Sequence, residues 1–455
     1  MSPVCLMPDQ GMNLKELTSF RMENMTQSTL FPAASLEAVT HPADGLLSDD
    51  LRLERDADGN LALISPPCPK AKAFFEHPRG NATPAVNGQA TTLDAAIAKA
   101  TEIFRAARHP LLSGLATDVY GMRAVMNLAE TSGATIDHMN SKSSMKNILV
   151  MQNSGWFVTT LSEVKNRVDL LVVIGTDIVS YFPRFFERVI WNKEAMFTEN
   201  TSDREIVYLG GRDLNTAPGV SPNGKQPDVL PCDLDRVPEV LAALRAIVAG
   251  KPLKADNVAG IARESLEKLA ERLKAAKYSV IAWTGSALDF PHAELSIQNI
   301  VGVVQELNKT TRSAGLPLSG NDGDVTAYNV STWISGYPFR NSYRRGYPDY
   351  DPYHYDTARL LAEGEADVLV WINSFKPERV PPKSKAPTIV IGHPAMQFEQ
   401  APEVFIPIAI PGLEANGAQF RSDSSVTLPL RKLRDTSLPT LADVLSAIES
   451  ALKVA

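Results

Sequence analysis

The chain has 455 residues, 44% of them hydrophobic, so it can bury the cores of two or three globular domains. Its 52 acidic residues outnumber 45 basic ones, and the net charge of -7 disfavours nucleic acid, whose phosphates favour a basic surface. Three cysteines without a C-x-x-C pair argue against a disulfide framework and a zinc finger. No apolar run is long enough to cross a bilayer and residues 1–27 lack a secretion-signal core, so we expect a cytoplasmic protein.

From about residue 94 onward, apolar runs alternate with segments of helical period, which is typical of a parallel sheet with crossover helices. Asp118 and Thr160 are placed to cap two of the predicted helices. The first half is expected to contain helix 97–108, strand 110–113, helix 118–130, strand 134–137, helix 158–167, strand 169–175 and strand 206–210. A stretch rich in Pro, Gly and Asn, residues 218–231, then predicts a linker or surface loop.

The second half repeats the alternation. It is expected to contain helices 237–248, 258–276 and 295–308, strands 279–283, 368–373 and 388–391, and a final helix 441–452. Residues 319–356 are rich in Gly, Pro, Asn, Asp and Tyr without periodicity, which predicts a long loop with a function or a partner. Within it, Gly320-Asn-Asp-Gly323 lacks phosphate-loop spacing and predicts a turn.

Several motifs carry a family resemblance. They are Gly336-Tyr-Pro-Phe339 with Arg345-Gly-Tyr-Pro348, residues 161–167 with Asp169, residues 45–51, and Ile406-Pro-Ile-Ala409 with Gly412, Glu414 and Gly417. They resemble motifs of the formylmethanofuran dehydrogenase B subunit, a branch of the molybdopterin oxidoreductases. The resemblance spans residues 41–430 and implies an α/β fold with two Rossmann-like domains and parallel sheets. We expect an extension (1–27), a small degenerate domain of the iron-sulfur type (28–92), and α/β domains at 93–220 and 221–455.

The family's iron-sulfur motif has lost its thiolates. In the family, C-P-x-C-G-x-x-C-D-D-L and a fourth cysteine hold a four-iron cluster. The matching run here has His41, Asp44 and Ser48 at the first three cysteine positions, and Cys68 is the expected fourth. Three hard donors beside one thiolate are a poor ligand set for an iron-sulfur cluster. We expect these side chains to cap or hydrogen-bond a turn, with Cys68 a buried thiol, and the alternative is an unusual mixed-ligand metal site.

The ligand of the family's pterin metal is also replaced. The family binds tungsten or molybdenum between two pterin dinucleotides, with a cysteine inside a run like S-V-C-H-G-P. Here Ser143 replaces that cysteine, Ser144 replaces the histidine, and Asp177 replaces the Asn of a family Asn-Pro pair. We therefore expect no cofactor, no metal and no catalytic residue in this chain. Because serine ligates molybdenum in some relatives, an active dehydrogenase with Ser143 as metal ligand remains the alternative.

A complete redox fold without redox ligands predicts a non-redox structural subunit. The resemblance implies a role like that of the B subunit of the formyltransferase/hydrolase complex of methylotrophic bacteria, which moves a formyl group from tetrahydromethanopterin to a methanofuran-type carrier and releases formate. The expected partners are an amidohydrolase-like A subunit, a C subunit and a formyltransferase subunit. The loop 319–356, with Arg340, Arg344 and Arg345, is expected to dock a neighbouring subunit or to hold the anionic carrier.

Overall fold

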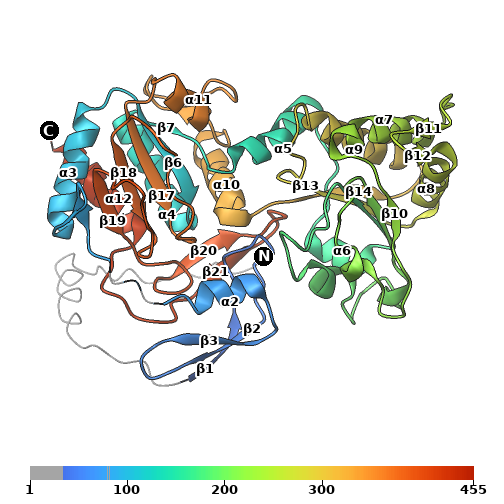
Figure 1. Cartoon of the computed structure of the whole chain (residues 1–455), viewed down its shortest axis with the longest axis horizontal. Coiled ribbons are helices and arrows are strands. Elements are labelled where there is room, and N and C mark those ends of the chain that lie inside the picture. The colour runs from blue at the N-terminus through green and yellow to red at the C-terminus, as the bar shows by residue number, and fades with distance from the viewer. Residues whose placement is uncertain (1–33, 79, 81, 455) are drawn as a thin grey trace, which may run out of the picture.

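The computed structural model describes residues 34–78, 80 and 82–454, which form three parts (Figure 1). Two α/β layers, one on a nine-stranded and one on a five-stranded sheet, lie side by side, and a small antiparallel sheet with one helix lies beneath the first. The predicted extension 1–27 lies outside the described residues. None of the helices in the described part of the chain has the length and apolar character that a bilayer span needs.

The larger sheet has the strand order β16-β15-β7-β6-β17-β18-β19-β4-β5. Its central strands β7, β6, β17, β18 and β19 run parallel, and each edge is closed by an antiparallel pair. The parallel strands are apolar along almost their whole length because helices cover both faces. The strands are β4 (Ala85–Val86), β5 (Gln89–Ala90), β6 (Pro110–Ala116), β7 (Thr135–Ile136), β15 (Asn341–Ser342), β16 (Asp349–Tyr350), β17 (Val368–Asn373), β18 (Thr388–Gly392) and β19 (Val404–Pro407).

Helices α3, α4, α10, α11 and α12 pack around this sheet (Figure 1). They span Leu93–Ala106, Val119–Ser132, Asp324–Ser335, Thr357–Ala362 and Leu441–Lys453. The predicted cap at Asp118 is confirmed, since its carboxylate accepts the amide hydrogens of Tyr120 and Gly121 at 3.3 and 3.0 Å. Gly133 ends α4 in the left-handed conformation that glycine adopts without strain.

The smaller α/β layer has five parallel strands in the order β10-β9-β8-β13-β14. These are β8 (Leu170–Ile174), β9 (Glu205–Leu209), β10 (Asp228–Leu230), β13 (Ser279–Thr284) and β14 (Ser313–Leu318). Its helices are α5 (Ser141–Ser154), α6 (Leu161–Arg167), α7 (Val237–Val248), α8 (Arg263–Ala275) and α9 (Glu294–Leu307), with the π-helical turn η1 (Phe186–Ile190). The predicted cap at Thr160 is confirmed, because its hydroxyl accepts the Glu163 amide hydrogen at 3.1 Å.

The third part is a three-stranded antiparallel sheet followed by a short helix. It contains β1 (Ala34–Val39), β2 (Leu51–Arg55), β3 (Leu61–Ser65) and α2 (Pro69–Phe75). Its apolar side packs on Phe375, Ile410, Leu413 and Leu433 next to the larger sheet. Two hairpins complete the fold, β11 (Asn257–Val258) with β12 (Ile261–Ala262) and β20 (Gly417–Phe420) with β21 (Thr427–Leu430).

The sheets do not follow the expected division of the chain at residue 220. Strand β6 pairs with β17, and β8 pairs with β13, so each sheet contains strands from both sides of that position. The chain leaves the nine-stranded sheet after β7, builds the five-stranded layer, and returns at β15. The α/β class with parallel sheets is confirmed, but the boundary at 220 is corrected. Apolar periodicity identifies strands without indicating which of them pair.

Residues 319–356 also differ from the expected long loop. They contain the short 3-10 turn η5 (Asn321–Gly323), helix α10, and strands β15 and β16. Helix α10 packs against α4, β6 and β20, so it is buried on more than one side and lacks the single apolar stripe that periodicity detects. Likewise the predicted linker 218–231 contains β10 at the edge of the smaller sheet.

Candidate functional site

A polar cavity of about 300 Å³ lies between the two α/β layers. Its wall is formed where β13, β14 and β17 end, together with the first turn of α5 and Lys70 of α2. In open parallel sheets, ligands bind in the crevice outside the carboxyl ends of the strands. The cavity therefore occupies the position where this class of fold places a ligand.

Two of the three predicted cofactor positions reach this cavity. Ser143 and Ser144 lie in the first turn of α5 and line it, and their amides donate to the Asn140 carbonyl at 3.0 and 3.1 Å. A Cβ added to Gly285 would lie 2.7 Å from the Ser143 carbonyl oxygen, so α5 and the loop after β13 are in direct contact. Asp177 does not line the cavity, because its carboxylate accepts from the amide and hydroxyl of Ser180 within one turn.

The cavity wall carries charged groups that pair with one another. The Asp322 carboxylate, buried at 6% exposure, lies 2.6 Å from the Lys376 ammonium and 3.3 Å from the Arg379 guanidinium. Asn140 donates to Asp322 at 3.2 Å and accepts from Arg379 at 2.7 Å. Burial works against ionisation of Asp322, but Lys376 and Arg379 hold its pKa below the usual range. The wall thus pairs the buried Asp322 carboxylate with two partly exposed cations.

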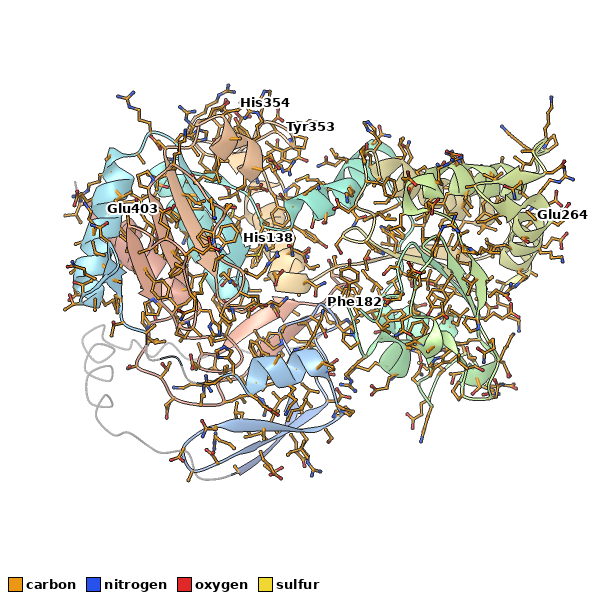
Figure 2. The ribbon with its side chains drawn as sticks, viewed as in Figure 1. His138, Phe182, Glu264, Tyr353, His354 and Glu403 are labelled. Atoms are coloured by element: carbon orange, nitrogen blue, oxygen red, sulfur yellow. The ribbon has the colours of Figure 1, made fainter. Side chains whose placement is uncertain are left out.

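Two further titratable groups border these ion pairs. His138 lies beside α10 (Figure 2), and burial lowers its pKa to about 4. Its Nδ1 accepts the Asn140 amide hydrogen at 3.0 Å, so the neutral ring carries its proton on Nε2 and donates to the Asp322 carbonyl at 3.2 Å. Burial, with the Asp322 charge beside it, raises the pKa of Asp324 to about 7.

Sequence patterns did not indicate that this cavity is lined by Asp322, Asp324, Lys376 and Arg379. Gly320-Asn-Asp-Gly323 does form the expected turn, but this turn brings the Asp322 carboxylate into the cavity wall. Their positions along the chain could have indicated this site, because Asp322 closely follows β14 and Lys376 closely follows β17. Ligands of this fold class bind beyond the carboxyl ends of the strands.

The four predicted cluster positions come together in the third part of the fold. The amide of His41 donates to the Ser48 carbonyl at 2.8 Å and closes the loop 41–48, while Cys68 precedes the first turn of α2. One donor atom each from His41, Asp44 and Cys68 lies within 4.8 Å of the others. Burial raises the pKa of the Cys68 thiol.

These side chains are buried without the hydrogen bonds that we expected in a turn. His41 is 0% exposed and packs against the rings of Phe74 and Phe75. Within the described residues, both ring nitrogens of His41, Oδ2 of Asp44 and Oγ of Ser48 have no hydrogen-bond partner. The Asp44 Oδ1 atom alone fits the expected turn, because it accepts the Leu46 amide hydrogen at 3.0 Å. Buried polar atoms are nearly always partnered, so this cluster requires an explanation.

The arginines of the segment 319–356 have different roles. Arg340 is buried and ion-paired, 2.5 Å from Asp356 and 3.6 Å from Asp137, so it holds the segment together. Arg344 and Arg345 are exposed, and Arg345 lies 3.3 Å from Asp349. Of the predicted anion-binding set, only Arg344 and Arg345 are accessible.

Comparison with known proteins finds relatives that are subunits of larger complexes. It is 30% identical over 359 residues to the B subunit of the tungsten-containing formylmethanofuran dehydrogenase 2 of Methanocaldococcus jannaschii, covering 77% of this chain and 80% of that protein. This chain belongs to the family of formylmethanofuran dehydrogenase B subunits. It is also 27% identical over 343 residues to the B subunit of the formyltransferase/hydrolase complex Fhc of Methylorubrum extorquens, covering 75% of this chain and 89% of that protein. No family model matches the chain.

Solved structures agree with this placement in the B-subunit family. The crystal structure of the FhcABCD complex of Methylorubrum extorquens with methylofuran contains a chain that superposes with a TM-score of 0.69 at 27% identity, covering 82% of this chain and 99% of that one. Acetylene hydratase of Pelobacter acetylenicus superposes with a TM-score of 0.62 at 11% identity, covering 92% and 70% respectively. The molybdopterin-oxidoreductase-like fold is confirmed, and the relatives are components of larger complexes.

The residues at the family's redox positions do not fit its cofactors. A four-iron cluster needs four thiolates, and the cluster position offers one thiol beside an imidazole, a carboxylate and a hydroxyl. Two pterin dinucleotides need more room than the cavity of about 300 Å³ together with the adjoining pocket of about 340 Å³, which shares Ser144, Asn147 and Ser319 with it. In this member of the B-subunit family, side chains that pair with one another occupy the wall of this cavity.

Proposed function

We propose that this chain is a non-redox structural subunit of a formyltransferase/hydrolase-type complex, equivalent to its B subunit. One observation carries the proposal: the fold is retained over the full length of the Fhc chain, while both redox positions have donors that suit neither a four-iron cluster nor a thiolate-bound pterin metal. Without a metal and an electron relay the chain has no redox chemistry to perform. Its role is then to organise the subunits that do the formyl transfer and hydrolysis.

In this proposal the partners are an amidohydrolase-like A subunit, a C subunit and a formyltransferase subunit, and the substrate of the assembly is a methanofuran-type carrier. The solved relative, a four-subunit complex with methylofuran, supports this assignment. The cytoplasm is the proposed compartment.

An aromatic surface on the segment 319–356 supports a docking role. Trp333 of α10 is 65% exposed, Tyr347 54% and Tyr353 69%. Tyr353 lies near α11 at the outer side of the larger layer (Figure 2). Tyr and Trp are enriched where subunits meet, and all three of these exposed aromatic side chains come from one segment of the chain. We assign this surface to contact with another subunit.

Metal analysis of the purified complex tests the proposal. We expect no stoichiometric tungsten, molybdenum or iron in this chain and no visible absorption from a pterin metal or a cluster. Finding one tungsten or molybdenum per chain would support the alternative instead, an active dehydrogenase in which Ser143, which lines the cavity, ligates the metal.

Substitutions test the docking surface. Trp333→Glu buries a charge at the contact and is expected to release the chain from its partners during gel filtration. Met196→Glu, at a side chain 76% exposed in the smaller layer, is the matched control and should leave the complex intact. A Trp333→Glu chain that co-elutes fully with its partners would contradict the assignment.

A carrier-binding role of the same segment has its own test. Arg344→Ala with Arg345→Ala removes the two accessible cations and leaves the buried Arg340 pairs in place. Weaker carrier retention in an intact complex would give these arginines a role in holding the anionic carrier. If carrier retention is unchanged, the segment has no role in holding the carrier, and docking to another subunit is its one proposed role.

A further inference from the structure

The loop 41–48 and the start of α2 bring together donors of three chemical kinds. An imidazole (His41), a carboxylate (Asp44) and a thiol (Cys68) lie with one donor atom each inside 4.8 Å of the others. His41 Nδ1 and Asp44 Oδ2 are 3.5 Å apart, too far for a good hydrogen bond. Ligands of a tetrahedral zinc, at about 2.0–2.3 Å from the ion, lie roughly 3.3–3.8 Å from each other. The His41–Asp44 separation of 3.5 Å falls in this range, and the 4.8 Å that bounds all three donors requires only a small inward movement of side chains to surround one ion.

The surroundings argue that these atoms have a common partner. The cluster is in an apolar core, with Phe74, Phe75 and Leu51 among the packed side chains. Among the described residues, the His41 nitrogens, Asp44 Oδ2 and Ser48 Oγ find no hydrogen-bond partner, and His41, Asp44 and Ser48 are each at most 1% exposed. These side chains are therefore closed off from bulk solvent. Buried polar atoms without a hydrogen-bond partner lower the stability of the fold unless they share a bound ion or another ligand.

We propose that His41, Asp44 and Cys68 bind a single zinc ion, with the Ser48 hydroxyl or a water at the fourth position. A neutral imidazole, a carboxylate and a thiolate around Zn²⁺ have no net charge, which suits a buried site. Magnesium and calcium prefer oxygen donors alone and are disfavoured by the thiolate and imidazole. This inference goes beyond the structural role proposed above and departs from our expectation that these positions bind no metal.

The ion would fasten the small third part of the fold to the wall of the cavity. His41 and Asp44 belong to the loop 41–48, and Cys68 to the start of α2, so one ion links the two. At the other side of that loop, the Gly45 carbonyl accepts the Ser422 amide hydrogen at 2.7 Å, and a Cβ on Gly45 would collide with the Ser319 carbonyl oxygen. Ser319 lines the cavity. The role we assign to the zinc is to order this wall.

Zinc content of the full-length chain, expressed in zinc-supplemented medium and purified without chelator, tests the site. We expect close to one zinc per chain in the unsubstituted protein and less than a fifth of that in Cys68→Ser and in His41→Gln. Cys232→Ser is the matched control and should keep its zinc, since Cys232 is a similarly buried free cysteine in a different hydrophobic cluster, the core of the smaller layer. Zinc content near zero in the unsubstituted chain, or equal in Cys68→Ser and Cys232→Ser, would overturn the proposal.

A second measurement does not depend on how the variants fold. Exchange of the bound ion for Co²⁺ in the unsubstituted chain should give tetrahedral visible bands and a thiolate-to-cobalt charge-transfer band in the near ultraviolet. A cobalt spectrum without thiolate character would overturn the ligand set. Iron with acid-labile sulfide in place of zinc would overturn both this inference and the proposed function, whereas tungsten or molybdenum beside zinc would overturn only the proposed function.

Discussion

The two places where the resemblance puts the family's redox groups differ sharply in this chain. At the cavity wall, Asp322 is paired with Lys376 and Arg379, and each charge has a partner of opposite sign. At the loop 41–48, His41 and Ser48 keep buried polar atoms without a partner among the described residues. At the cavity wall, ion pairs compensate the buried carboxylate. At the loop 41–48, the donors of His41, Asp44 and Cys68 lie close together without such compensation, and this is where we propose the zinc ion.

Asp322→Ala should have the largest effect on the cavity wall. It leaves the Lys376 and Arg379 cations without their carboxylate and removes one of the two acceptors of the Asn140 side-chain amide. We expect the free energy of unfolding to fall by about 3 kcal/mol, since removing one partner of a buried charge network leaves the others uncompensated. Urea unfolding of the purified chain measures it.

The control for Asp322 is an exposed ion pair. Lys142 and Asp289 lie 3.0 Å apart with side chains 79% and 69% exposed, so Asp289→Ala should cost less than about 0.5 kcal/mol. The double variant Asp322→Ala with Lys376→Met should recover part of the loss by removing the stranded cation. Equal effects of Asp322→Ala and Asp289→Ala would show that the ion pairs of the wall stabilise the fold no more than an exposed pair.

Asp324→Asn tests the same wall through its pH dependence. The pKa of Asp324 is raised by burial to about 7, against about 3.9 in an unfolded chain. Between these values only the native state holds the proton, so the native protein loses stability as pH rises from about 4 to about 7. Asparagine mimics the neutral acid and does not titrate. The variant should gain about 2 kcal/mol relative to the unsubstituted chain between pH 5 and pH 8.

The difference between the two proteins isolates Asp324 from other groups. Burial lowers the pKa of His138 to about 4 and, with the His77 charge beside it, that of His393 to about 3, so both proteins lose stability as pH falls below about 6.5. That loss is shared and cancels. A difference in unfolding free energy that is the same at pH 5 and pH 8 would contradict a native Asp324 that titrates near 7.

Periodicity predicted the regular parts of the fold well and the irregular ones poorly. Helices α7 and α9 and strand β17 lie within about a residue of the predicted ranges, because each has one buried face or is wholly apolar. Helix α10 was missed because several elements cover it, and α5 because its first turn is polar. The pairing of β6 with β17 depends on contacts more than 200 residues apart along the chain, which no local pattern contains.

Some residues of the candidate site were predicted from the sequence and others were not, again because local patterns do not contain long-range contacts. The resemblance located His41, Asp44, Ser48 and Cys68, and the structure brings them together. We expected these side chains to cap or hydrogen-bond a turn. Residue types alone do not reveal that, among the described residues, both His41 ring nitrogens lack hydrogen-bond partners. The charged wall was missed altogether, since Asp322 and Lys376 follow different strands and meet only after the two sheets have formed.

Ser48→Ala is the smallest change and the sharpest test of the contrast between the two places. A buried hydroxyl without a partner costs free energy, so in chelator-treated protein its removal should stabilise the fold by about 0.5 kcal/mol. With zinc bound the sign should reverse, because the hydroxyl is then a ligand and alanine leaves its position to water. Thermal unfolding of the unsubstituted chain and of Ser48→Ala, each with zinc and with chelator, measures whether the substitution raises or lowers stability in each state. An effect of one sign in both states would place the Ser48 hydroxyl away from the ion and assign the fourth ligand to water.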